Sequence, residues 1–257
     1  MSAMKDLDLA RTIISMIDLT NLNDDCTRHD IDDLCANARA AEGRPATAAV
    51  CVWPSFVAQS KRALSGTQVR VATVVNFPKG GTDTAAVLAE TAKVLEAGAD
   101  EIDLVFPYTA WTLGDVSTAT EQVQAIRAAI HAPVQLKVII ETGELANQDL
   151  IRAASLMCIE EGADFIKTST GKVAENATLD SARIMLTAIA EAGQPVGFKP
   201  AGGIRTFDEA RDHLALAGSI LGEGWATPQT YRFGASSLLA SVEAVLTGGD
   251  AAPATGY

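Results

Sequence analysis

The chain has 257 residues, a length that suits one large α/β domain or two small ones. Its formal net charge of −12 at pH 7 argues against non-specific binding to nucleic acid or to an anionic membrane surface. Four scattered cysteines without a CxxC pair and only three histidines argue against a disulfide framework and a histidine-rich metal site.

The N-terminal stretch carries Asp6 and Asp8 and lacks the apolar core of a secretory signal. No stretch of the sequence approaches the ~20 apolar residues that a membrane-spanning helix needs. We therefore expect a cytoplasmic protein without a membrane partner.

Short apolar runs recur along the chain, and a helical pattern follows most of them. The runs that predict strands are 47–53, 69–76, 100–106, 133–140, 164–169, 196–199, 217–221 and 231–236. Continuous runs rich in valine and isoleucine are typical of parallel strands that are covered on both faces. Between them, alanine-rich segments such as 82–98 and 179–193 end on glycine, which predicts helices with a glycine after the last turn.

Eight strand–helix alternations in one chain of this length predict a single (β/α)₈ TIM barrel spanning 1–257. Residues 1–40 are expected to form extra N-terminal helices that cover the bottom of the barrel, and residues 248–257 a flexible tail. A doubly wound sheet is the alternative, but no GxGxxG follows the first predicted strand. The barrel is the preferred architecture.

Two segments of the sequence repeat one another. EAGADEID (96–103) and EEGADFIK (160–167) align without a gap at an offset of 64 residues. The alignment puts Asp103 and Lys167 at equivalent depths on the third and fifth predicted strands. Because one interior layer of such a barrel takes its side chains from alternate strands, we expect the two to share a layer. A structural salt bridge is the alternative, although such pairs are usually unfavourable to bury without a role.

The last four of the eight lysines fall in or just after predicted strands, and they are Lys137, Lys167, Lys172 and Lys199. Lys167 and Lys199 stand at strand ends, where the active site of a barrel forms. Two amines in one low-dielectric mouth repel each other when protonated, and burial disfavours the charge further. A lysine in water has a pKa of ~10.4 and is protonated near neutral pH. Repulsion and burial lower this pKa, which makes the amine a Schiff-base nucleophile. An aspartate at a neighbouring strand end strengthens this interpretation.

Glycines and serines after three predicted strands indicate a phosphate site. They are Gly171 with Lys172, Gly202 with Gly203, and Gly234 with Ser236 and Ser237. Barrels often bind phosphate with the backbone of their last loops and with a helix N-terminus. Ordinary N-capping of the final helix by the two serines is the alternative. Arg205 is expected to serve this loop or a surface ion pair.

Other polar residues have less specific interpretations. Cys51 could line the pocket, but a buried free cysteine more often packs. Asp18 and Thr20 in MIDLTNLND could mark no more than a helix terminus. Lys137, followed by Glu141, is expected as a charge neighbour in the barrel interior.

The motifs together closely resemble those of the deoxyribose-phosphate aldolases, a family of class I aldolases. The matching segments are MIDLTNLND, EIDLVFPY, LKVIIETGEL, FIKTSTGK, GFKPAGGIR and YRFGASSLL, and the match runs from about residue 14 to the last residue. The resemblance implies a (β/α)₈ fold and a lyase without metal or organic cofactor. It implies reversible cleavage of 2-deoxy-D-ribose 5-phosphate into acetaldehyde and D-glyceraldehyde 3-phosphate. The implied partners are sugar phosphates, aldehydes and a second copy of the chain in a homodimer.

By motif position, the resemblance implies four catalytic residues. Lys167 forms the imine, Lys199 is its cationic neighbour, and Asp103 belongs to the proton relay. Tyr257, the last residue, is implicated in proton transfer at the enamine carbon, and the AAPATG segment before it is a variable tail.

The implied substrate contacts fall into two groups. Asp18 and Lys172 contact the hydroxyl groups or the phosphate end, and Cys51 matches a pocket cysteine. The phosphate loops contain Gly171, Gly202, Gly203, Gly234, Ser236 and Ser237. Thr20, Lys137, Thr170 and Arg205 complete the predicted substrate-binding set.

Two other functions stay open from the sequence. A transaldolase-like enzyme would also form a Schiff base, but on a longer sugar phosphate. A sugar-phosphate sensor would bind without turnover and would keep binding when Lys167 is replaced. The sensor has no use for a lysine pair that lowers the pKa of one amine.

Overall fold

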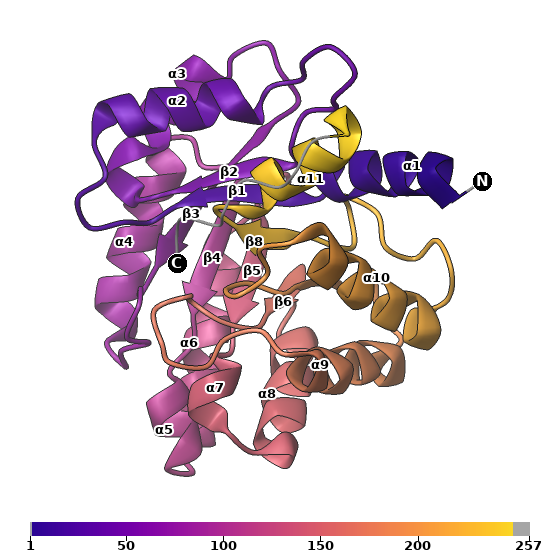
Figure 1. The fold of residues 1–257 in the computed structure, drawn as a ribbon. Helices are drawn as coiled ribbons and strands as arrows, with labels where there is room; N and C mark the ends of the chain where they lie inside the picture. Colours follow the sequence, from indigo (N-terminus) through magenta and orange to yellow (C-terminus); the bar gives the residue numbers. More distant parts are fainter. Residues whose placement is uncertain (1, 249–257) are drawn as a thin grey trace.

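The computed structural model describes residues 2–248, and its eight parallel strands form a nearly closed barrel surrounded by helices (Figure 1). The strands are β1 (Ile17–Asn21), β2 (Ala49–Val52), β3 (Arg70–Val75), β4 (Glu101–Val105), β5 (Gln135–Ile139), β6 (Phe165–Lys167), β7 (Gly197–Lys199) and β8 (Phe233–Ala235). They pair in chain order, and β1 also pairs with β8. Between β7 and β8, parallel bridges join Phe198 to Tyr231 and Ala201 to Gly234. The predicted TIM barrel is confirmed.

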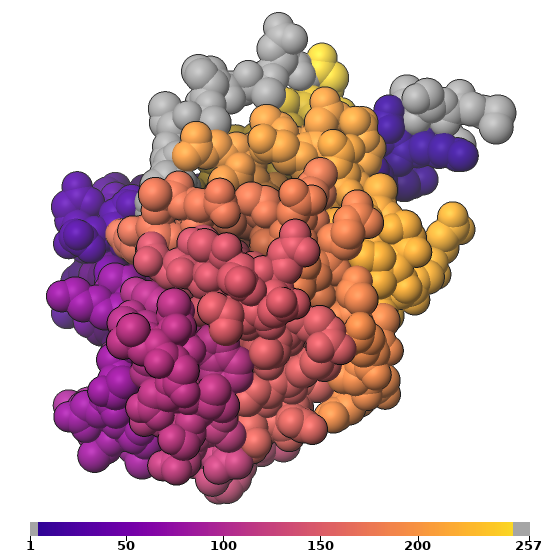
Figure 2. Space-filling model, turned by 90° about the horizontal axis from the view of Figure 1, so that it is seen from below, coloured from indigo at the N-terminus to yellow at the C-terminus, as the bar shows by residue number. Residues whose placement is uncertain are grey.

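The helices form the outer layer. They are α1 (Ser2–Ser15), α2 (Arg28–Ala38), α3 (Val57–Ala63), α4 (Thr84–Glu96), α5 (Tyr108–Thr112), α6 (Val116–Ala129), α7 (Thr142–Leu145), α8 (Gln148–Glu160), α9 (Leu179–Ala192), α10 (Phe207–Leu221) and α11 (Leu238–Thr247), with a 3₁₀ turn at Pro54–Phe56. Across one face of the molecule the colours follow chain order from indigo through magenta to orange, so successive helices lie side by side (Figure 2). Within the described residues, no helix combines the length and the hydrophobicity needed to span a membrane.

Two predictions about the elements are wrong. Residues 217–221 are the last turns of α10, which begins at a capping box between Thr206 and Glu209 and continues through them without a break. The segment 1–40 is only partly a helical cover, because it contains β1, and α2 follows this strand as a helix of the barrel itself. Only α1 precedes the barrel, and it packs against α10 and α11 (Figure 1).

The strand faces divide the core into two parts. Ile102 and Leu104 on β4 belong to the large apolar core between the sheet and the helices. The residues that alternate with them, Glu101 and Asp103, are also fully buried, which places them on the inner face of the barrel. A small, separate apolar cluster of Leu22, Ala49, Cys51, Ala72 and Val74 fills the interior beside β2 and β3. The rest of the interior is available to charged side chains.

Candidate active site

Asp103 and Lys167 share one layer of the barrel interior, as predicted, and they are also in direct contact. Lys167 is the last residue of β6, and its Nζ donates to Asp103 Oδ2 over 2.8 Å. Lys199 ends β7 in direct register with Lys167, and its Nζ donates to the same oxygen over 2.8 Å. The strands β4 and β6 are alternate strands, as the interior layers of a barrel require.

A third amine meets the same carboxylate. Lys137 on β5 donates from Nζ to Asp103 Oδ1 over 3.0 Å, and its neighbour Glu101 Oε2 lies 2.5 Å away. Asp103, Lys137 and Lys199 are fully buried, and Lys167 is 3% exposed. One buried aspartate therefore accepts hydrogen bonds from three buried lysines.

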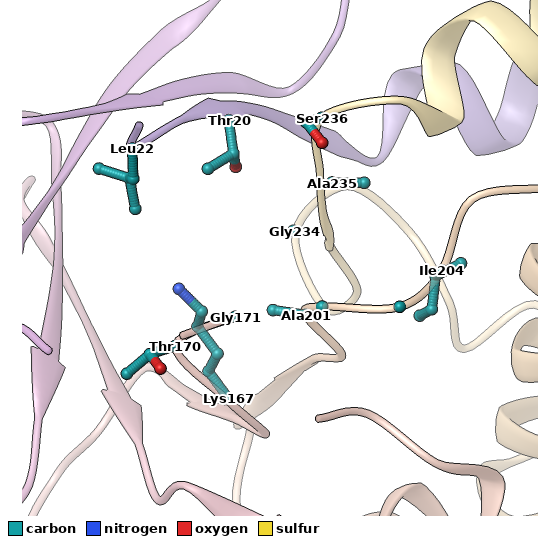
Figure 3. A pocket seen from close by; sticks show the side chains of 12 residues that line it. Thr20, Leu22, Lys167, Thr170, Gly171, Ala201, Ile204, Gly234, Ala235 and Ser236 are labelled. Carbon is teal, nitrogen blue, oxygen red and sulfur yellow. The ribbon is translucent and has the colours of Figure 1, made fainter. Parts of the chain in front are cut away.

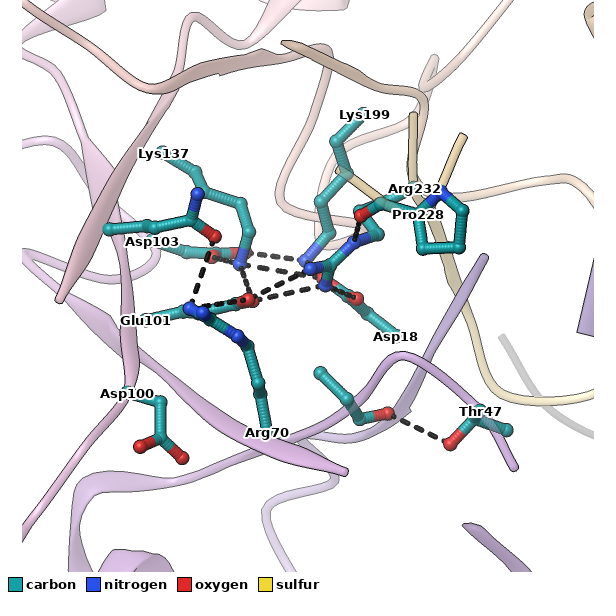
Figure 4. A network of polar contacts seen from close by, with 12 residues as sticks. Asp18, Thr47, Arg70, Asp100, Glu101, Asp103, Lys137, Lys199, Pro228 and Arg232 are labelled. Atoms are coloured by element: carbon teal, nitrogen blue, oxygen red, sulfur yellow. Dashed lines mark hydrogen bonds and ion pairs between the residues drawn. The ribbon is translucent and has the colours of Figure 1, made fainter. Parts of the chain in front are cut away.

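A second set of ion pairs lies below this carboxylate (Figure 4). Asp18 on β1 lies 2.5 Å from Lys199 Nζ and accepts from Arg232 over 2.7 Å. Arg232, directly before β8, also donates to Glu101 over 2.9 and 3.2 Å. The seven side chains form one network that crosses the barrel interior.

The network separates the three lysines by their pKa. Burial opposes the positive charge on Lys137 and Lys199, but Asp103 and the other carboxylates outweigh it and raise the pKa of both amines. Burial lowers the pKa of Lys167, Asp103 offsets only part of this effect, and Lys199 lowers it further. The pKa of Asp103 is held well below its usual value, because the three lysines outweigh its burial.

The charges in this interior balance when Lys167 is neutral. Three carboxylates, those of Asp18, Glu101 and Asp103, face three side chains whose pKa is raised, those of Lys137, Lys199 and Arg232. Burying an uncompensated charge is strongly unfavourable, so a proton on Lys167 is the least favoured. Lys167 is the amine that is suited to attack a carbonyl carbon.

A cavity opens above Lys167, and the amine points into it (Figure 3). The cavity holds about 420 Å³ of empty space, counting its open mouth. Its wall is formed by the ends of β1, β6, β7 and β8 and by the loops after them. The lining residues are Thr20, Leu22, Lys167, Thr170, Gly171, Ala201, Gly202, Gly203, Ile204, Gly234, Ala235 and Ser236. The three predicted glycine and serine loops thus meet at one pocket.

The backbone of the pocket wall requires glycine at Gly202. Its φ is +80°, in the left-handed region, and a Cβ atom there would lie 2.7 Å from Cβ of Asn176. The close approach brings bare backbone, rather than a side chain, to the cavity. Backbone approach of this kind suits a phosphate group.

Three residues of the predicted substrate-binding set lie in the interior and not at the cavity wall. Asp18 and Lys137 are fully buried in the ion network, and Cys51 belongs to the inner apolar cluster. Burial raises the pKa of the Cys51 thiol, with Asp103 adding to the effect. Asp18 is a strand residue and not the helix terminus that the sequence left open.

Three other predicted residues lie outside the pocket wall. Arg205 is exposed, and its backbone N–H donates to Glu209. Lys172 lies 3.8 Å from Asp24. Ser237 holds the N-cap position of α11, but its side chain makes no capping hydrogen bond. The alternative interpretation, ordinary N-capping of the final helix by a serine side chain, therefore fails for Ser237. Tyr257 lies outside the described residues.

Two contributors to the site, Glu101 and Arg232, were missed in the sequence, and a third, Glu141, was noted there only as following Lys137. Glu101 is two residues before Asp103 and therefore shares its strand face, and this spacing could have revealed it. Arg232 carries no comparable local signal. Glu141 is buried with a left-handed φ of 54°, and its Oε1 accepts from the N–H of Thr170 over 3.1 Å. This carboxylate, whose pKa is raised by burial, fixes the turn that follows Lys167.

Among residues 2–248 there is no cluster of three or more histidine, cysteine, aspartate or glutamate residues that could hold a metal ion. The carboxylates of Asp18, Glu101 and Asp103 are instead paired with lysine and arginine.

Known proteins resemble this chain over its full length. A sequence profile described as DeoC/LacD family aldolase matches residues 12–244. A deoxyribose-phosphate aldolase from Agrobacterium fabrum (strain C58 / ATCC 33970) is 52% identical over 259 residues, which cover 100% of this chain and 99% of the relative.

Solved structures share the fold. A chain from Coccidioides immitis, provisionally assigned as a deoxyribose-phosphate aldolase, superposes with a TM-score of 0.78 at 30% identity, over 90% of this chain and 85% of that one. The deoxyribose phosphate aldolase from Aeropyrum pernix, described as a unique tetrameric structure, gives a TM-score of 0.74 at 23% identity, over 94% and 95% of the two chains. At this identity the second likeness concerns the fold alone.

Proposed function

Because the chain belongs to the DeoC/LacD aldolase family, we propose that Lys167 is the residue through which it acts as a class I aldolase. The reaction is the reversible cleavage of 2-deoxy-D-ribose 5-phosphate into acetaldehyde and D-glyceraldehyde 3-phosphate. The observation that carries the assignment is that Lys167 combines a lowered pKa with a place in the cavity wall, whereas Lys137 and Lys199 have raised pKa values and lie outside the wall. The match over the whole chain favours this reaction over a transaldolase-like one and over a sensor without turnover.

The neutral amine of Lys167 attacks C1 of the open-chain sugar, and loss of water gives a protonated imine. This cation is an electron sink for the electrons of the C2–C3 bond. When the C3 hydroxyl loses its proton, the bond breaks, glyceraldehyde 3-phosphate leaves, and an enamine stays on Lys167. Protonation of the enamine carbon and hydrolysis then release acetaldehyde and restore the amine.

Asp103 and Lys199 are assigned to the proton relay. Asp103 Oδ2 accepts from Lys167 Nζ over 2.8 Å, and Lys199 Nζ donates to the same oxygen over 2.8 Å. Both residues are therefore close to the nitrogen on which the imine forms. The low pKa of Asp103 makes it a fixed negative charge that stabilises the protonated imine, so we assign the transferred proton to a bound water that these two groups hold.

The phosphate end of the substrate is assigned to the loops around Gly171, Gly202 and Gly234, with Ser236. These loops line the same cavity as Lys167. Contacts remote from the reacting bond position C1 beside the amine, so losing them lowers the rate as well as the affinity.

Reductive trapping tests the assignment of Lys167. Acetaldehyde and sodium borohydride together should leave a stable ethyl adduct on Lys167, located by peptide mass mapping. An adduct on another lysine, or none at all in an active preparation, contradicts the proposal. The same treatment without acetaldehyde is the control for reagent damage.

Gly202→Ala tests the phosphate assignment, and Gly66→Ala is its matched control. Both glycines have a left-handed φ, +80° and +77°, but a Cβ at Gly66 meets nothing within 4 Å. Both variants are expected to lose about 1 kcal/mol of stability from the backbone strain, and Gly202→Ala loses more because its Cβ also displaces Asn176. Only Gly202→Ala should lose at least about tenfold in kcat/KM for the phosphorylated sugar, with a smaller loss for 2-deoxyribose itself. Equal losses on the two substrates would show that this loop does not hold the phosphate.

We also infer that the enzyme works in the cytoplasm as a homodimer. Sugar phosphates are charged and do not cross a bilayer unaided, which supports the compartment. The homodimer is the assembly that the resemblance of the sequence motifs implies.

A further inference from the structure

We propose that the ion pair between Glu101 and Arg232, which lies beneath the pocket, positions the charges of the barrel interior so that Lys167 stays unprotonated. This inference rests on the proposed role of Lys167 as the imine-forming residue. It assigns a function in the reaction to two residues that contact no substrate.

Neither member of the pair lines the substrate cavity. Glu101 is the first residue of β4 and Arg232 directly precedes β8, so both lie near the amino ends of the strands. Arg232 faces a different cavity there, lined also by Arg70 and Gln135 at the starts of β3 and β5. Glu101 is fully buried and Arg232 is 4% exposed.

The geometry of the pair is that of a fixed bidentate contact. Arg232 donates from Nη2 to Glu101 Oε1 over 2.9 Å and from Nη1 to Oε2 over 3.2 Å. Its Nε donates to the carbonyl oxygen of Pro228 over 2.5 Å, and the guanidinium lies 5.6 Å from the centre of the Phe165 ring. A guanidinium held on all sides in this way keeps its charge at every working pH.

The pair is linked to Lys167 through shared partners, and Figure 4 shows these partners, Asp18, Asp103, Lys137 and Lys199. Glu101 pairs with Lys137, and Arg232 pairs with Asp18, which in turn pairs with Lys199. Lys137 and Lys199 are the two amines that share Asp103 with Lys167. Arg232 is therefore separated from Lys167 by two carboxylates and one lysine, all of them buried.

The effect of the Glu101–Arg232 pair on Lys167 follows from the number of buried positive and negative charges. With Arg232 present, three carboxylates face three cations and a proton on Lys167 would be in excess. Without Arg232, two lysines remain for the three carboxylates, and the missing positive charge is supplied by a proton on Lys167. Without Glu101, the cations are in excess, and Lys167 holds a proton even less readily.

Other charged groups contribute to the same balance and must be held constant. Lys167 is faced by Asp103 on β4, Lys199 on β7, Cys51 on β2 and Glu141 after β5. The Glu101–Arg232 pair is faced by Asp18 on β1, Arg70 on β3 and Lys137 on β5. Arg70 is half-exposed and 3.7 Å from Glu101, so solvent screens it and it is a suitable control.

The test is the pH dependence of imine formation, measured as the initial rate of borohydride-trapped acetaldehyde adduct on Lys167 between about pH 5 and 10. Arg232→Met should move the acid limb of this profile upward by about one pH unit or more, which is a loss of about tenfold at a pH below the limb. Arg232→Lys keeps the charge and should stay near the parent. Glu101→Gln should move the limb to lower pH. The double variant, Glu101→Gln with Arg232→Met, restores the balance and should return it to the parent position.

A structural role would lower the rate of every variant without moving the limb in opposite directions. The proposal is overturned if Arg232→Met does not move the limb upward, or moves it no further than Arg70→Met. If Arg232→Met does not fold, the double variant and Glu101→Gln test the proposal. An acid limb in Glu101→Gln that is unmoved or shifted to higher pH refutes it. Absence of an adduct on Lys167 in the parent refutes the proposed function instead, so the two failures are distinguishable.

Discussion

Replacing Lys167 with methionine is expected to abolish cleavage and synthesis while leaving the fold as stable as that of the parent, or more so. Removal of a covalent nucleophile typically costs at least about 10⁴-fold in kcat. The stability argument is separate. Because Lys167 is the one lysine of the network whose pKa is lowered, its loss leaves three carboxylates and three cations in balance. Methionine fills similar space without a polar group that needs a partner.

Lys137→Met is the matched control for this prediction. Lys137 is equally buried, contacts Asp103 and Glu101, and does not line the cavity. Its loss removes the lysine partner of Glu101, and a proton on Lys167, which pairs with Asp103, replaces that charge only in part, so we expect about 3–5 kcal/mol of destabilisation. Chemical denaturation and steady-state kinetics of the two variants give the comparison. Residual imine formation in Lys167→Met, or equal destabilisation of both variants, would contradict the assignment of Lys167 as the neutral amine.

The local patterns in the sequence were sufficient for the barrel and for the centre of the site. The 64-residue repeat placed Asp103 and Lys167 at one depth because each copy contains the same turn and strand start. The rule of alternate strands then brought them into one layer, and the observed 2.8 Å contact confirms this step. Equivalent positions in two copies of a repeat lie at the same depth along their strands. Residues at the same depth on alternate strands form one layer of the barrel interior.

The missed features are those with no local signature. β1 was hidden because Asp18 interrupts its short apolar run, and the charge is tolerated only through Lys199 and Arg232, which lie far along the chain. Residues 217–221 have the composition of a short strand, but the helix that began at Thr206 continues through them. Arg232 was missed for the same reason as β1, since its partners Asp18 and Glu101 are joined to it only by closure of the barrel.

Asp103→Asn is expected to remove activity and stability together, unlike Lys167→Met. Asp103 is the common acceptor of three amines at 2.8 to 3.0 Å. An asparagine offers one carbonyl oxygen to the three amines. Its NH₂ group is only a donor, so it cannot accept a hydrogen bond from a lysine. The cations of Lys137, Lys199 and Arg232 then face only the two carboxylates of Asp18 and Glu101. One buried positive charge lacks a counter-charge, so we expect about 3–5 kcal/mol of destabilisation near neutral pH. Loss of the charge that stabilises the protonated imine should lower kcat by about 10²- to 10⁴-fold.

The pH dependence of stability gives this prediction a sign. In the parent, Asp103 has a folded pKa below its unfolded value, so its contribution is present above about pH 3.9 and lost as the pH falls through the folded pKa. In Asp103→Asn, the buried lysines bind protons less readily than in the unfolded chain. Stability must then rise as the pH increases from 7 towards 10, because the unfolded state binds more protons. Asp8→Asn, which alters an exposed pair with Arg11, should change stability by less than about 1 kcal/mol and keep the slope of the parent, to which the lowered pKa of Lys167 contributes. Denaturant titrations at several pH values measure the stability of both variants and of the parent. A slope for Asp103→Asn no steeper than that of the parent would mean that its lysines find another counter-charge in the barrel.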